Sequence, residues 1–375
     1  MRQNALGEFT YIWQRPNWAN FSWNAGRVLP ALGEARLRQG VFRGALLGAA
    51  PAEQLTAHAR TITEEVIDTS GIEGERLDDD AVRSSVARRL GLPEGGLGPE
   101  DARADGVVAI TLDATQHYAE PLTASRLHGW HAEMFPLERE KGGRSAIARW
   151  RDDGGGPMQV VSGPIHRPKV HFEAPPAERV AAEVDRFATW FNAEHAMDGL
   201  IRAAQAHLWF VTVHPYDDGN GRIARAITDM ALARDEASPN RFISMSRQIR
   251  REKGRYYDIL ERTQKGDSDI TLWLEWFLTC YAHGAEHAVA ILEDVLRASR
   301  FWKAYQNVAF TARQKKVLER LLGHFEENVT AKKWAALGRT SLDSAQRDIS
   351  QLVEMGVLGR NRGGSKNTTY SLREA

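Results

Sequence analysis

Apolar side chains recur every three or four residues along most of this sequence, which is the spacing of a helix with one buried face. Three such stripes are Leu55, Ala59, Ile62 and Val66; Val180, Val184, Phe187 and Phe191; and Ile201, Ala204, Leu208 and Val211. Further helices are predicted over 247–264, 271–296 and 311–323. The spacing therefore predicts a mainly α-helical body.

One stretch departs from the helical spacing. After the glycine-rich turn RDDGGGP at 151–157, the segments 158–162 (MQVVS) and 169–172 (KVHF) have the character of two short strands. A β-hairpin is predicted here, and an exposed strand edge on it would suit an extended peptide. An ordinary structural hairpin is the alternative.

The N-terminal segment 8–26 is rich in large aromatic residues, which seldom stay exposed. They are Phe9, Tyr11, Trp13, Trp18, Phe21 and Trp23. We expect this segment to pack against the body of the protein or against a partner subunit.

Composition places the chain among ordinary globular proteins. Its 375 residues are 42% hydrophobic and 26% charged, with 49 Lys and Arg balancing 49 Asp and Glu. One hydrophobic core stops growing at roughly 250–300 residues, so we expect several domains. No apolar run reaches the roughly 20 residues that span a bilayer, and the first residues lack the pattern of a secretory signal. We therefore expect a cytoplasmic protein; its single cysteine, Cys280, excludes an intrachain disulfide and is predicted to lie in the core.

The last 75 residues differ from the body in charge, with 13 Lys and Arg against 7 Asp and Glu. Helices are predicted over 312–322, 330–337 and 341–355, followed by two strands within 357–372. This order resembles a winged-helix module, whose third helix reads DNA in many relatives. That helix, however, carries Asp343, Asp348 and Glu354 against Arg347 alone. DNA binding is therefore left open but not favoured.

The stretch 214–225, HPYDDGNGRIAR, concentrates the chemistry of the sequence. The proline after His214 disfavours helical backbone, so the preceding helix should end near 213 and leave His214 extended. Gly219, Asn220 and Gly221 permit a tight turn whose amides converge at the start of a new helix near Arg222. Such a turn binds anions, phosphate above all.

Charged side chains complete the picture of a phosphate site. Arg222 and Arg225 share one helix face, and guanidinium groups pair well with phosphate oxygens. Asp218 is placed to hold a Mg²⁺ ion that bridges those phosphates. His214 could accept a proton from an attacking hydroxyl. The spacing therefore indicates phosphoryl or nucleotidyl transfer.

The same twelve residues resemble the signature of Fic-domain proteins, His-Pro-Phe-x-(Asp/Glu)-Gly-Asn-Gly-Arg-x-x-Arg, with Tyr216 as the one departure. Tyrosine would serve if its hydroxyl finds a partner. The resemblance implies transfer of AMP from ATP to a protein hydroxyl, with His214 as general base and Asp218 as Mg²⁺ ligand. It also implies an ATP-binding set formed by Gly219, Asn220, Gly221, Arg222, Ile223, Ala224, Arg225 and Tyr256. Tyr256 is the weakest member, because paired aromatics on a helix are more often core.

An upstream segment, 69–74 (TSGIEG), contains Ser70 and Glu73 at the spacing of a capping box, which is typical of a helix start. It also resembles the Fic inhibitory motif, matched by Thr69, Glu73 and Gly74. That resemblance implies that Glu73 pairs with Arg225 and obstructs the γ-phosphate.

Taken together, the resemblance implies a protein adenylyltransferase that modifies a Tyr, Thr or Ser hydroxyl of a target and of itself, with Glu73 as inhibitor. The regions are expected at 1–110 (N-terminal, with the inhibitory motif), 111–300 (Fic catalytic domain) and 301–375 (winged-helix-like). Its partners would be ATP and a target protein bound along the 158–172 flap, and the resemblance allows a homodimer. The alternatives are removal of AMP, transfer of another group such as UMP or phosphocholine, and a transcriptional regulator that senses nucleotide.

Overall fold

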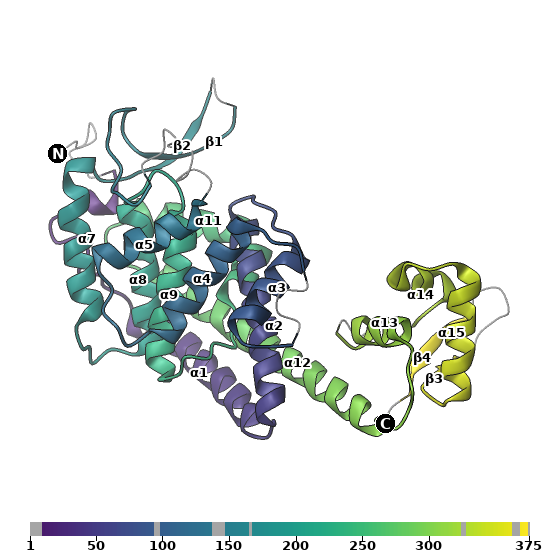
Figure 1. The fold of residues 1–375 in the computed structure, drawn as a ribbon. Helices are drawn as coiled ribbons and strands as arrows, with labels where there is room; N and C mark the ends of the chain where they lie inside the picture. The colour runs from purple at the N-terminus through teal and green to yellow at the C-terminus, as the bar shows by residue number, and fades with distance from the viewer. Residues whose placement is uncertain are drawn as a thin grey trace. The chain divides into compact units, whose positions relative to one another are not determined.

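The computed structural model describes residues 10–93, 98–136, 147–164, 167–323, 328–361 and 368–373. The chain divides into two compact units: Met1–Gly44 with His58–Ala288, and Ala45–Ala57 with Val289–Ala375. Helices dominate both, and the described strands form two antiparallel pairs (Figure 1). This confirms the mainly α-helical fold predicted from the spacing of apolar residues. The predicted region boundaries near residues 110 and 300 stay predictions.

The elements of the larger unit follow the predicted stripes, although α1, α2 and α12 continue into the smaller unit. Their order is a short 3-10 helix η1 (Ile12–Gln14), α1 (Ala25–Leu47), α2 (Pro51–Ile72), α3 (Asp79–Arg89), α4 (Ala102–Gln116), α5 (Ala124–Met134), β1 (Gln159–Ser162), β2 (Lys169–Glu173), α7 (Ala177–Asn192), α8 (Gly199–Val213), α9 (Asn220–Glu236), α10 (Met245–Arg251), α11 (Lys253–Gln264) and α12 (Thr271–Ala304). The helix predicted over 247–264 is divided at Glu252, and the one predicted from 271 extends to Ala304. Among the described residues no helix is long and apolar enough to cross a membrane.

Two adjacent helices, α8 and α9, form the centre of the larger unit (Figure 1). Every residue of α8 from Ala203 to Val213 is buried, and so is almost every residue of α9 up to Ala233. Helices buried around their whole circumference lie inside the core, and their buried polar side chains need partners there. Because α8 ends and α9 begins at the segment 214–219, that segment is held between two buried helices.

The aromatic N-terminal segment packs against this unit. This confirms the first of the two alternatives expected from the sequence, packing against the body of the protein. The Trp18 ring is 1% exposed and lies 5.8 Å, edge to face, from the Trp209 ring of α8. The Trp13 indole Nε1 donates to the carbonyl of Glu173 at 2.7 Å. Large rings with one polar atom are buried well in this way. Phe9 lies outside the described residues.

The predicted hairpin is present as β1 and β2, with a bulge between Val160 and Val161. His171 fastens it to α11, because its Nδ1 lies 2.6 Å from a Glu261 carboxylate oxygen. On its other side, His171 Nε2 lies 2.6 Å from the Ser162 hydroxyl. Lys265 first, and then His171, lower the pKa of Glu261 to about 2, so this carboxylate is charged at neutral pH. Residues 165–166 of the connection lie outside the described residues.

The smaller unit contains the helices α13 (Ala312–Gly323), α14 (Ala331–Gly338) and α15 (Leu342–Glu354), followed by strands β3 (Leu358–Arg360) and β4 (Tyr370–Leu372). Its core gathers around the fully buried Trp334. Asp348 is also buried, accepts a hydrogen bond from the Trp334 indole, and pairs with Arg313 at 2.6 Å. The carboxylate of Asp348 therefore does not lie on the exposed face of α15. Its predicted contribution to an acidic, DNA-repelling face of this helix was wrong. The helix and strand order agrees with the prediction, and a winged-helix role stays a prediction.

Candidate active site

His214 caps the C-terminal end of α8 and is the first residue of the motif 214–225. Its backbone is left-handed, with φ 51° and ψ 59°, and its N–H caps the helix by donating to the carbonyl of Phe210 at 3.0 Å. The prediction of extended backbone at this position was therefore wrong. The following proline disfavours right-handed helical backbone at His214 but not left-handed backbone. A left-handed residue is also a common way to end a helix.

The imidazole of His214 is set up as a neutral base. Its Nδ1 lies 3.3 Å from the carbonyl of Val211. A carbonyl only accepts hydrogen bonds, so Nδ1 carries the proton and Nε2 keeps its lone pair. Burial lowers the pKa of His214 to about 4. At neutral pH this side chain is therefore able to accept a proton from a hydroxyl.

The loop after His214 is closed by its own side chains. Asn220 accepts a hydrogen bond from the N–H of Tyr216 at 2.9 Å and donates to the carbonyl of the same residue at 2.7 Å. Gly219 has φ 82°, and a Cβ there would approach the Met134 sulfur to 2.9 Å. Only glycine adopts such a backbone in so little space. Helix α9 begins directly at Asn220, two residues earlier than predicted, so its positive end faces this loop.

Tyr216 fills the position where the sequence departs from the Fic signature. Its ring is fully buried and stacks on His131, with centroids 4.1 Å apart and planes at 13°. Its hydroxyl lies 3.1 Å from His128 Nδ1. The polar atom that tyrosine adds thus has a partner, as the sequence argument required.

Glu73 reaches the second arginine of the motif. A Glu73 carboxylate oxygen lies 2.7 Å from Arg225 Nη2, and Arg225 also donates to the side chain and to the carbonyl of Thr69 at 2.6 and 3.0 Å. The segment 69–74 lies at the end of α2 rather than at a helix start, which removes the capping-box alternative. The geometry therefore places a carboxylate on the guanidinium that was predicted to hold a phosphate.

The electrostatics of this pair favour a charged state on both sides. Burial alone would raise the pKa of Glu73, but Arg225 more than offsets it, and the pKa ends below its usual value. Arg225 itself is 2% exposed, and its Nη1 is buried without a hydrogen-bond partner. A Cβ on Gly221 would collide with the Glu73 carboxylate. An orphan donor beside a glycine at a helix N-terminus is an arrangement that a phosphate oxygen fits.

Arg222, the first arginine of the motif, has acidic neighbours of its own. Its Nη1 donates to Glu75 at 2.7 Å, and its Nη2 lies 3.9 Å from an Asp218 oxygen. Its guanidinium also lies over the Phe135 ring, 5.2 Å from the centroid. Both motif arginines are thus covered by carboxylates from the segment that follows α2.

Asp218 fits the role of a Mg²⁺ ligand. Its side chain is 71% exposed, and one oxygen accepts the N–H of Gly219 at 2.6 Å. Mg²⁺ is commonly bound by one or two carboxylates together with the phosphates of a nucleotide. Among the described residues, no cluster of three or more His, Cys, Asp or Glu side chains is arranged to hold a metal unaided. A single exposed carboxylate beside a phosphate cradle agrees with a metal that arrives with its nucleotide.

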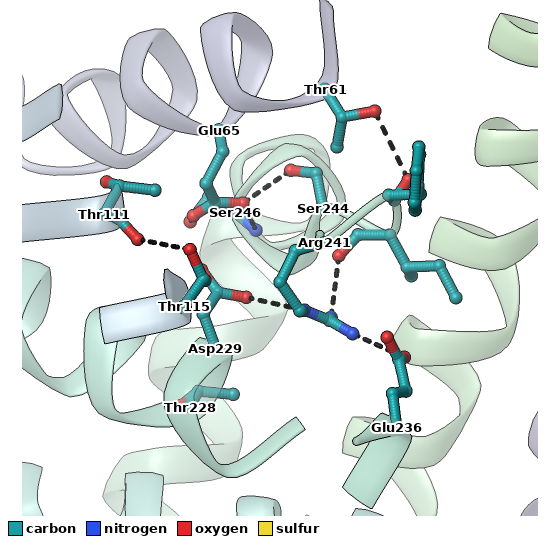
Figure 2. A network of polar contacts seen from close by, with 12 residues as sticks. Thr61, Glu65, Thr111, Thr115, Thr228, Asp229, Glu236, Arg241, Ser244 and Ser246 are labelled. Carbon is teal, nitrogen blue, oxygen red and sulfur yellow. Dashed lines mark hydrogen bonds and ion pairs between the residues drawn. The ribbon is translucent and has the colours of Figure 1, made fainter. Parts of the chain in front are cut away.

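The helix that carries Thr69 is anchored by a buried polar network (Figure 2). Glu65 of α2 accepts hydrogen bonds from Ser244 and Ser246, and Arg241 links Asp229 of α9 to Glu236. Burial, and after it the Glu65 carboxylate, raise the pKa of Asp229. Because such a network is costly to break, α2 and α9 are both held to the segment 241–246.

The other predicted residues lie deeper. Ile223 and Ala224 face the core and are fully buried, so only their backbone could contact a ligand. Tyr256 is 2% exposed, and its hydroxyl lies 2.9 Å from His207 Nε2. Its neighbour Tyr257 is 37% exposed. Stacking of Tyr256 on a base stays a prediction.

Two residues of the site were not predicted from the sequence. Glu75 lies two positions beyond the inhibitory glutamate, and its proximity in sequence was the only signal. Arg151 donates from Nε to the carbonyl of His214 at 2.7 Å and from its backbone N–H to the carbonyl of Pro215 at 3.0 Å. It lies far from the motif in sequence, so nothing in the spacing indicated that it fixes the loop that begins at His214.

Two known protein families match parts of this chain. Residues 121–232, which include the loop and most of α9, match the Fic/DOC family. Residues 11–92, which include α2 and the segment 69–74, match a domain of unknown function, DUF4172.

Curated relatives match the chain over short stretches. A "Protein adenylyltransferase Fic" of Culex quinquefasciatus is 36% identical over 86 residues, which are 22% of this chain and 16% of that protein. A "Uridine 5'-monophosphate transferase" of Xanthomonas campestris pv. campestris (strain 8004) is 40% identical over 72 residues, 17% of this chain and 13% of that protein. The chain thus spans only about a sixth of the first of these relatives.

Solved structures extend the likeness in fold to most of the chain. A Fic family protein from Desulfovibrio desulfuricans G20 superposes with a TM-score of 0.52 at 17% identity, covering 93% of this chain and 96% of that one. A Fic domain containing signaling protein from Bacteroides thetaiotaomicron gives the same score and identity over 69% and 97%. The chain therefore has a mainly helical fold of the kind seen in these proteins.

Proposed function

We propose that this protein is a nucleotidyltransferase that transfers AMP from ATP to a Tyr, Thr or Ser hydroxyl of a target protein and of itself, and that Glu73 inhibits it. The observation that carries the proposal is the ion pair between Glu73 and Arg225 at the N-terminus of α9. A carboxylate there occupies the place of an anionic phosphate, in a cradle built from the glycine turn. The adenylyltransferase names of the partial relatives support the same chemistry.

In this reaction the protein's own groups have separate tasks. His214 Nε2 takes the proton of the target hydroxyl, whose oxygen forms a bond to the α-phosphorus. The bond from that phosphorus to the β-phosphate oxygen breaks, and pyrophosphate leaves. Arg222, Arg225 and the amides at the start of α9 stabilise the negative charge. Asp218 would hold a Mg²⁺ ion, which would neutralise part of the charge on the nucleotide phosphates.

The β1–β2 hairpin is proposed to align the target. Within the described part of the chain, β1 pairs with β2 alone, which leaves its other edge for an added strand. Val161 on it is 51% exposed. An extended target segment would gain main-chain hydrogen bonds along this edge and bring its hydroxyl toward the loop.

The experiment compares the unaltered chain with Glu73→Gly and with Glu73→Gly/His214→Ala, each incubated with Mg²⁺ and ATP. We expect added AMP, seen by intact-protein mass spectrometry, on Glu73→Gly and only traces on the other two. Circular dichroism checks that all three are folded. Equal modification of the first two proteins would contradict inhibition by Glu73, and none on any of them would contradict the transfer.

UMP transfer is a second candidate, favoured by the relative named as a uridine 5'-monophosphate transferase. The proposed cradle consists of backbone amides and arginine side chains, which recognise phosphate and not the base, so it suits either nucleotide. Parallel incubations of Glu73→Gly with ATP and with UTP separate the two by the mass that is added.

A further inference from the structure

Two arginines lie together at the end of α9 that is farther from the catalytic loop. Arg234 is in the last turn of α9, and Arg202 is in the first turn of α8. Their guanidinium groups both lie over the ring of Phe191, 4.5 and 5.8 Å from its centroid. Among the described residues, neither arginine forms an ion pair. This is unlike Arg222 and Arg225, each of which has a carboxylate partner.

Backbone carbonyls hold these side chains in place without neutralising them. Arg234 donates to the carbonyls of Tyr118, Phe191 and Glu120 at 2.7, 2.8 and 2.8 Å. Arg202 donates through Nη2 to the carbonyl of Phe191 at 2.5 Å. The carbonyl of Phe191, which both arginines contact, lies at the C-terminal end of α7, whose dipole offers only about half a negative charge. Two full positive charges therefore exceed what the fold supplies.

The two arginines line a pocket of about 280 Å³ between the α4–α5 connection and the end of α7. Glu194, an exposed side chain, is the one carboxylate among its described lining residues. Arg202 Nε is buried without a hydrogen-bond partner, and its Nη1 has no protein partner in the described part of the chain. The pocket thus combines space, positive charge and an unsatisfied guanidinium.

The pKa values of both arginines are lowered, as expected where no carboxylate of the described residues pairs with the protonated guanidinium to stabilise it. Burial lowers the pKa of Arg202, and burial followed by the charges of Arg202 and Arg126 lowers the pKa of Arg234 to about 10. Arg126 is itself paired with Asp113, so it cannot be satisfied by the same anion. An anion in the pocket would relieve the repulsion between the first two.

We propose that this pocket is a second anion site, which binds a small oxyanion of the phosphate class between Arg202 and Arg234. Arg202 donates from Nη1, which has no protein partner in the described residues, to a phosphate oxygen, as guanidinium groups do with oxyanions. Arg234, whose donors are occupied, contributes its charge. The volume admits inorganic phosphate, pyrophosphate or the phosphate group of a nucleotide. The site does not depend on the proposed transfer reaction.

The test is calorimetric titration of the full chain with inorganic phosphate, pyrophosphate and AMP at constant ionic strength, with chloride as the reference anion. We expect the phosphate compounds to bind and chloride not to. Equal affinity for phosphate and AMP would identify the phosphate group alone as the ligand, and tighter AMP binding would identify a nucleotide. Chloride binding as tight as phosphate would overturn the proposal.

Three variants locate the site. Arg202→Gln should weaken phosphate binding about tenfold or more, because it removes a positive charge and a charge-assisted hydrogen bond to the phosphate. Glu194→Gln, which removes the opposing charge at the rim, should strengthen it. Arg27→Gln, which removes an exposed arginine on α1 that pairs with Glu275, should leave it unchanged. An unchanged affinity in both Arg202→Gln and Glu194→Gln, or an equal loss in Arg27→Gln, would overturn the assignment. Thermal melting checks folding, and the result with Glu194→Gln decides the matter even if Arg202→Gln fails to fold.

Discussion

The arginines at the two ends of α9 differ in whether a carboxylate of the chain pairs with them. At the N-terminal end, the motif arginines are paired with Glu73 and Glu75 from the segment after α2. At the C-terminal end, Arg234 and its neighbour Arg202 meet carbonyls and the ring of Phe191, with no carboxylate partner in the described residues. The same chemical group is thus covered by the protein's own anions at one end and left open at the other.

The difference teaches how this fold controls access to an anion site. A carboxylate that is supplied by the chain competes directly with a phosphate for the same guanidinium. Glu73 directly follows α2, which is anchored through Glu65 by a buried network, so under the proposed inhibition the folded chain itself holds the competing carboxylate in place. Where no such helix is present, the positive charge is free to meet an external anion.

Loss of the base should have the largest effect and should separate the two ends. In a Glu73→Gly background, His214→Ala should lower the rate of AMP transfer by about 10²–10⁴-fold, the range for loss of a general base. Phosphate binding at the Arg202 pocket should not change. The measurements are labelled-ATP incorporation and phosphate titration on the same preparations. Transfer at the unaltered rate in the double variant would show that His214 is not the base.

Removal of the inhibitory charge comes next. Glu73→Gln keeps the size of the side chain but loses the ion pair with Arg225, and it should raise self-modification roughly 5–150-fold, the usual range of such coupling. Glu75→Gln is the matched control, because its partner is Arg222. Rates of label incorporation for both variants test the difference. An equal rise in the two would mean that the brake is general electrostatics and not the Glu73 contact.

The pH dependence should distinguish a buried base from an exposed one. Because burial lowers the pKa of His214 to about 4, its base form persists down to about pH 5. An ordinary histidine, with a pKa near 6.5, would lose about tenfold in rate at pH 5.5. We expect the Glu73→Gly protein to lose less than about twofold there. A decline of about fivefold between pH 6.5 and 5.5, which a histidine with a pKa near 6.5 would give, would contradict the assignment.

Other buried histidines limit the pH range of that experiment, because they lower the free energy of unfolding in acid. The pKa values of His58, His131 and His207 are also lowered by burial, to about 4, 4 and 3. The unfolded chain takes up these protons near pH 6.5, whereas the folded chain does not. The free energy of unfolding should therefore decrease as the pH falls from about 6.5 toward 4, by about 1.4 kcal/mol per pH unit for each histidine. Urea titrations at several pH values measure it.

Local signals in the sequence predicted much of the fold and site. The spacing of apolar residues predicted the helices, and the motif at 214–225 brought together the base, the glycine turn and the arginines. What the sequence could not supply was long-range pairing. Arg151 fixes the loop from a distant segment, and the pocket formed by Arg202 and Arg234 arises only when four separate segments meet. The left-handed backbone of His214 was missed because the rule for a residue before proline names what is disfavoured, not which alternative a helix end selects.

The smallest effect is expected at the position that departs from the Fic signature. Tyr216→Phe removes the hydroxyl next to His128 but keeps the ring stacked on His131. Loss of one hydrogen bond should lower the free energy of unfolding by about 0.5–1.5 kcal/mol and leave the rate of transfer within a few-fold. Urea unfolding and label incorporation measure the two. A loss of transfer comparable to that of His214→Ala would show that the hydroxyl takes part in the chemistry.

The central claim is that the Glu73 carboxylate occupies the place of a nucleotide phosphate on Arg225. Calorimetric titration of ATP into the unaltered chain and into Glu73→Gln tests it without requiring any transfer. We predict that ATP binds more tightly once the carboxylate is neutral, and that the gain disappears when Arg225→Gln is added. Equal ATP affinity in the unaltered chain and in Glu73→Gln would contradict the account.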